Sequence, residues 1–146
     1  MFEGSSNVIN MEIAKADYFS GNFDSAKNLL KSVKLKYEDT VVFINYYILL
    51  SYCYLSLGDK DSLLETHERI KRFEKGLENK KRFRRERTKF YYNGIRESSI
   101  NIAILQNDDT LINLLSEELK EVETELQKVR LNYYMGKKYY ELKNFH

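Results

Sequence analysis

The chain of 146 residues contains no proline and only six glycines, and this scarcity of turn-forming residues limits its fold more than any other feature. Proline and glycine supply the frequent tight turns that sandwiches and barrels require. Apolar residues instead recur every three or four positions, which is typical of helices. The length suits one hydrophobic core. We therefore predict a single all-α domain over residues 1–146.

Seven helices are predicted from the apolar spacing and from the residues that interrupt it. Gly21, Gly58 and the run Asn107–Asp109 are expected to end helices, and a turn is expected at Gly76–Asn79. The predicted helices are about Val8–Phe19, Phe23–Tyr37, Thr40–Leu57, Leu63–Leu77, Lys81–Gln106, Asp109 to near Glu123, and Thr124–Leu142. The first buries a stripe of Val8, Ile9, Ile13, Ala16 and Phe19.

Two Ser/Thr-x-x-Glu/Gln patterns predict capping boxes at helix starts. One is Ser62–Glu65, at the end of the stretch Asp59–Ser62 that can cap the fourth helix, and the other is Thr124–Gln127. The leucine spacing from Asp109 to Leu142 permits a single long helix, so the second pattern is what indicates a break near Glu123.

The segment Thr40–Gly58 carries no charged residue, and its length could span a bilayer. Its asparagine, serines and four tyrosines favour a helix packed between other helices.

The lone Cys53 cannot form an intramolecular disulfide, and the first residues show no secretory signal. We expect a cytoplasmic protein without a membrane span.

Side chains suited to catalysis are few. The sequence has two histidines and no phosphate-binding glycine loop, HExxH or GxSxG pattern. His67 falls on an apolar stripe and Cys53 in an uncharged segment, so both are predicted to pack in the interior. The acidic residues of Glu117–Glu125 are predicted to form a solvated face. We predict a protein that is not an enzyme and holds no metal or cofactor.

The segment Lys80–Lys89 interleaves cations with an aromatic residue and is the strongest local charge feature. Its candidate basic patch consists of Lys81, Arg84, Arg85 and Arg87, which could bind nucleic acid or an acidic partner. The cations could equally cover a solvated helix through their alkyl stems. In a helix, Phe83, Phe90 and Gly94 would form the inward stripe while Lys81, Arg84 and Arg85 face elsewhere, so the solvated face is the preferred interpretation. The net charge of +2 is too balanced to indicate nucleic acid.

Pairs of helices repeat a pattern of small and aromatic residues. Ala14, Gly21, Phe23 and Ala26 mark the first unit, Ser51, Tyr54 and Gly58 the second, and Gly136 and Tyr139 the last. These patterns resemble the tetratricopeptide repeat, with units longer than the family's ~34 residues. The resemblance implies an α-solenoid of stacked antiparallel helix pairs, in which the small residues let helix backbones approach. A plain helical bundle is the alternative.

The resemblance also implies a concave groove that binds an extended peptide or a helix of a partner protein. The residues at the matching positions are Lys15, Tyr18, Asn45, Ile48, Tyr52, Arg130, Tyr133, Lys137 and Tyr140. A weaker resemblance is to the helical sensor domains of peptide-pheromone receptors of Gram-positive bacteria. The competing hypotheses are a self-associating structural protein, or a regulator that contacts nucleic acid or an acidic partner through residues 80–89.

The last predicted helix matches the first helix of a repeat and has no following partner helix. Repeat arrays need a covered end. We therefore expect this chain to be part of a longer array, and we expect the isolated chain to form a homodimer through this helix.

Overall fold

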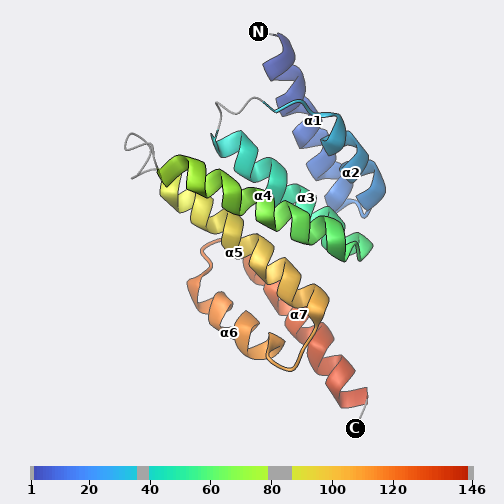
Figure 1. The fold of residues 1–146 in the computed structure, drawn as a ribbon. Coiled ribbons are helices and arrows are strands. Elements are labelled where there is room, and N and C mark those ends of the chain that lie inside the picture. The colour runs from blue at the N-terminus through green and yellow to red at the C-terminus, as the bar shows by residue number, and fades with distance from the viewer. Residues whose placement is uncertain (1, 36–39, 79–86, 145–146) are drawn as a thin grey trace. The chain divides into compact units, whose positions relative to one another are not determined.

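A computed structural model describes residues 2–35, 40–78 and 87–144, and Figure 1 shows that these residues form helices joined by turns and loops. The described ranges contain no strand, so the predicted all-α class is confirmed. The stacked solenoid stays a prediction. The helices are α1 (Phe2–Phe19), α2 (Phe23–Ser32), α3 (Thr40–Leu57), α4 (Lys60–Glu78), α5 (Arg87–Gln106), α6 (Leu111–Glu121) and α7 (Glu125–Asn144).

The predicted break before the last helix is confirmed, and its cap is the expected one. The Thr124 hydroxyl oxygen accepts the Gln127 backbone N–H at 3.3 Å, and the hydroxyl donates to Gln127 Oε1 at 2.9 Å. These two bonds begin a new helix after an extended Val122.

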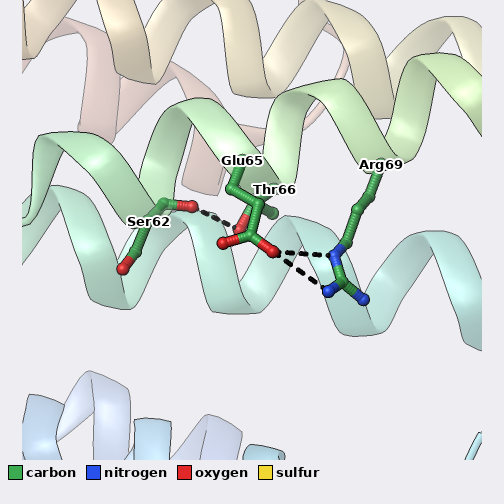
Figure 2. A network of polar contacts seen from close by, with 4 residues as sticks. All are labelled: Ser62, Glu65, Thr66 and Arg69. Atoms are coloured by element: carbon green, nitrogen blue, oxygen red, sulfur yellow. Dashed lines mark hydrogen bonds and ion pairs between the residues drawn. The ribbon is translucent and has the colours of Figure 1, made fainter.

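The expected cap of the fourth helix within Asp59–Ser62 is confirmed, but the capping box predicted at Ser62–Glu65 is wrong. Asp59 caps α4 instead, because its carboxylate accepts the Ser62 N–H at 3.1 Å and the Ser62 hydroxyl at 2.7 Å. Ser62 therefore lies inside the first turn. Glu65 pairs with Arg69 at 3.0 Å one turn later, and Thr66 donates to the Ser62 carbonyl at 2.8 Å (Figure 2).

Glycines with a left-handed backbone end the first and third helices, as predicted. Gly21 has φ +84° and Gly58 has φ +71°. At Gly58, the N–H groups of Gly58 and Asp59 donate to the carbonyls of Leu55 and Tyr54 at 3.1 and 2.9 Å. This paired bonding satisfies the last carbonyls of the helix and reverses the chain.

Gly76 behaves differently, and the turn predicted there is wrong. The helix α4 continues through Gly76 to Glu78. Among the described residues, no atom lies within 4 Å of the position that a Cβ on Gly76 would take, so the helix tolerates the glycine without needing it.

These two environments predict opposite effects of the same substitution. Gly58→Ala should destabilise the protein by about 1 kcal/mol, because an L side chain strains a left-handed backbone. Gly76→Ala should stabilise it by about 0.5–1 kcal/mol, because alanine loses less backbone entropy in a helix. Urea denaturation of both variants measures the difference. Effects of the same sign would contradict the assigned backbone conformations.

Residues 1–102 and 103–146 form two compact units, and the boundary falls within α5. In the first unit, α2 packs against α1 and α3, and α4 packs against α3. The buried residues of α3 include Ile44, Leu50, Cys53 and Tyr54, so the predicted packing of this uncharged helix between others is confirmed. Among the described residues, no helix combines the length and apolar character needed to cross a bilayer.

The face of α1 that turns inward is not the predicted apolar stripe. Val8, Ile9, Ile13 and Phe19 are all about half exposed or more, and Ala14 is the buried residue. The reason is a close fit: Ala14 offers little bulk, Tyr18 packs its ring on Phe23, and Asn7 donates to the Lys34 carbonyl at 2.7 Å. The inward face therefore carries small and polar residues.

In the second unit, α7 holds the turn that ends α5. Asn107 has φ +53°, and its N–H donates to the Ala103 carbonyl at 2.9 Å. Lys138 is buried on α7, and its ammonium donates to the Asn107 carbonyl at 2.8 Å. The Asn107 side chain donates to Glu141 Oε2 at 2.9 Å. A cation at a helix C-terminus is stabilised by the carbonyl dipoles.

Lys138→Met should therefore cost about 1–2 kcal/mol, because the substitution removes a charge-assisted hydrogen bond and leaves the turn carbonyl unsatisfied. The matched control is Lys137→Met, which removes the same group from an exposed neighbour and should change stability by less than about 0.5 kcal/mol. Equal effects in urea denaturation would show that the turn does not depend on Lys138.

Candidate functional site

The nine residues predicted to line a groove fall in both units. Lys15, Tyr18, Asn45, Ile48 and Tyr52 belong to the first unit, and Arg130, Tyr133, Lys137 and Tyr140 belong to the second. Each group is described within its own unit.

In the first unit, the structure brings Tyr18 and Tyr52 together. Their ring centroids are 5.9 Å apart, and the Tyr52 hydroxyl donates to Glu97 Oε2 at 2.6 Å. Lys15 and Asn45 are exposed. Ile48 packs against the buried pair Ile44 and Ile70. The two tyrosines are half-buried and contribute to packing as well as to the surface.

The carboxylate that accepts from Tyr52 belongs to a buried polar face of α5 that the sequence analysis missed. Glu97, Ser98 and Asn101 are all buried there, and the Asn101 amide donates to the Ser51 hydroxyl at 2.8 Å. Gly94 lies one turn earlier, and a Cβ on it would stand 3.1 Å from Ile44 Cγ2. Their spacing of three and four residues from Gly94 is the signal in the sequence that indicates a shared helix face.

His67 lies in the interior, as predicted. Its Nδ1 is 2.7 Å from the Ser98 hydroxyl, and the same hydroxyl donates to the Ile95 carbonyl at 3.0 Å. Such a distance would suit a base and a nucleophile. Ser98 has no exposed surface, however, so a substrate has no path to its oxygen. The pair is a packing contact between α4 and α5.

Cys53 is also buried, as predicted, and burial raises the pKa of its thiol to about 11. A thiol with this pKa is a poor nucleophile at neutral pH. Among the described residues, no group of three or more His, Cys, Asp or Glu side chains is placed to hold a metal ion.

The predicted solvated acidic face is confirmed for Glu117, Glu121, Glu123 and Glu125, which are exposed. The candidate basic patch cannot be placed in the same way. Lys81, Arg84 and Arg85 lie outside the described residues, and Arg87 begins α5 with a side chain that also lies outside them.

In the second unit, the predicted groove residues share one helix, and two of them stand on an exposed apolar stripe. Leu126, Val129, Tyr133 and Tyr140 of α7 are 56%, 65%, 63% and 69% exposed. Gly136 lies between the two tyrosines and is also exposed. We call these five residues the α7 outer face. The opposite side of α7 buries Leu131 and Lys138.

Gly136 corrects one expectation from the repeat pattern. It was expected to let two helix backbones approach, but no atom of the part of the chain that the structure describes lies within 4 Å of the position that its Cβ would take. Tyr139, expected to fill the remaining space, is 55% exposed. The pattern in the last repeat therefore marks a surface of α7, whereas Ala14, Ala26 and Ser51 are fully buried as expected.

Basic side chains flank the α7 outer face. The Arg130 guanidinium is half-buried and lies over the Tyr134 ring, with 5.6 Å between its carbon and the ring centroid. Lys137 is exposed. Tyrosine and arginine together are the residues most enriched where protein partners bind. This face is the strongest candidate for a functional site in the second unit.

Comparison with known protein families, with curated proteins and with solved structures finds no match for this chain.

The buried His67 predicts a pH dependence of stability. Burial, and secondarily the nearby Lys71, lowers its pKa below the ordinary 6.5. The folded state thus favours the neutral ring, so this contribution to stability is complete above about pH 6.5 and is lost as the pH falls through the depressed pKa. Wild-type protein should lose stability between pH 7.5 and 5, and His67→Asn should lose less.

Urea denaturation at the two pH values measures this loss. His146→Asn, which changes the other histidine of the sequence, should keep the wild-type dependence. If both variants follow the wild type, the folded state does not depend on a neutral His67.

Proposed function

We propose that this chain is a protein-interaction module that binds a peptide or protein segment on the α7 outer face. The observation that carries the proposal is the continuous exposure of Leu126, Val129, Tyr133 and Tyr140 along one side of a helix. Exposed apolar residues gathered in this way mark interaction sites, whereas single exposed apolar side chains are ordinary.

The chemistry of the face suits a helical segment of a partner. Apolar residues at helical spacing bind the apolar stripe of an amphipathic helix. Tyrosine adds rigid contact area together with a hydroxyl that can bond at the edge of an interface. Arg130 and Lys137 beside the stripe would favour acidic residues at the margins of the bound segment.

The proposal includes a tetratricopeptide-like arrangement in which α1, α3, α5 and α7 are the first helices of successive pairs. Support comes from the fully buried Ala14, Ala26 and Ser51, which occupy small-residue positions of that pattern. The glycine turns at Gly21 and Gly58 agree with it as well. In this arrangement the exposed Lys15 and Asn45 would lie on the groove-lining helices of the first unit.

Selection from a displayed library of random peptides tests the proposal. Wild-type protein should enrich amphipathic sequences, and Tyr133→Ser combined with Tyr140→Ser should weaken their binding by at least about tenfold, since buried interface tyrosines commonly contribute more than ~1 kcal/mol each. Binding is measured by fluorescence anisotropy of a labelled selected peptide.

Phe19→Ser is the matched control, because Phe19 is a comparably exposed aromatic residue on α1. It should leave peptide binding unchanged. Failure to enrich any peptide, or an equal loss in the control, would refute the α7 outer face as the binding site.

A further inference from the structure

The α7 outer face has the spacing of a helix that pairs with another helix. Leu126, Val129, Tyr133, Gly136 and Tyr140 follow one another in alternating steps of three and four residues. This alternation keeps a stripe on one side of a helix that winds around a partner, and it defines the a and d positions of a heptad. Leu126, Tyr133 and Tyr140 take a, and Val129 and Gly136 take d.

Gly136 supports close pairing at the centre of the stripe. A glycine inside an exposed helix costs about 1 kcal/mol relative to alanine and offers no contact in return. At a d position it would let the partner backbone approach, with Tyr133 and Tyr140 filling the space on either side. Within residues 2–35, 40–78 and 87–144, no atom lies within 4 Å of the position that its Cβ would take.

The charged residues beside the stripe favour a second copy of this chain as the partner, and they favour a parallel orientation of the two helices. In this lettering Arg130 and Lys137 take e positions, and Glu125 takes the preceding g position. In a parallel pair each g residue faces the following e residue of the other helix. Glu125 of each copy would then face Arg130 of the other. In an antiparallel pair e faces e, which would set the basic residues against each other.

We infer that the α7 outer face pairs in parallel register with the same face of a second copy of this chain. The inference rests on the proposed function, since it names the partner that occupies the same surface. Glu125 is 85% exposed and bonds Lys128 at 2.8 Å within α7, so its carboxylate stands at the surface where a second copy would meet it.

Sedimentation equilibrium on the whole chain tests for the pair, with circular dichroism showing that each variant keeps its helix content. Wild type should dimerise, and Glu125→Arg or Arg130→Glu alone should raise the dimer dissociation constant at least about tenfold through like-charge contacts. Mixing the two variants should restore association. In the mixed dimer, position 125 of each copy again faces a side chain of opposite charge at position 130 of the other.

Cross-linking tests the direction. In a parallel register the two copies of residue 126 meet, so Leu126→Cys should form an intermolecular disulfide under mild oxidation. Leu114→Cys, on an exposed site of α6, is the control and should not. The native Cys53 is fully buried and should stay reduced.

Every outcome of these experiments either supports or overturns the inferred parallel pair. A wild type that stays monomeric at high concentration overturns it, whether α7 is then protected from hydrogen exchange by its own chain or left open to solvent. A dimer without the Leu126→Cys cross-link or without rescue on mixing also overturns it. A monomer that still captures peptides through Tyr133 and Tyr140 would overturn the second copy and keep the proposed function.

Discussion

The first unit depends on covering α3, a helix without a charged side chain. A helix that is apolar on nearly all sides is stable in water only when other helices surround it. α2 and α4 pack along it, and α5 reaches it through Gly94, whose missing side chain leaves room for Ile44. The stacked rings of Phe43 and Phe73, 4.0 Å apart, join α3 to α4. The positions of the other helices follow from the need to shield α3.

Covering α3 also buries polar side chains of α5, which need partners. Asn101 is fully buried, and an unpaired buried amide would cost more than a hydrogen bond returns. Its amide donates to the Ser51 hydroxyl, which itself donates to the Ile48 carbonyl at 2.7 Å, and Glu97 accepts from the Tyr52 hydroxyl. These pairs are satisfied only when α5 lies at one register against α3. The contact between His67 and Ser98 likewise helps to fix the position of α5. This contact is therefore structural, although histidine and serine also suit catalysis.

In the second unit, one side of α7 packs in the interior and the other side is exposed. Lys138 on the inner side of α7 binds the turn at Asn107, while Tyr133 and Tyr140 lie on the outer side. The buried lysine and Leu131 fix the rotation of α7 about its axis within the unit. The same contacts therefore hold the outer face as a preorganised stripe, which would lower the entropic cost of the proposed binding.

The sequence by itself determined where the helices lie and how most of them begin and end. The bounds of α3, the glycine turns and the Thr124 cap all depend on residues within a few positions of one another, so local patterns predict them. Only the tertiary structure decided which faces are buried: the apolar stripe of α1 points outward, Gly136 is open, and Asn101 is inside. Burial depends on partners distant in sequence, such as Ser51 for Asn101, and helical periodicity carries no information about them.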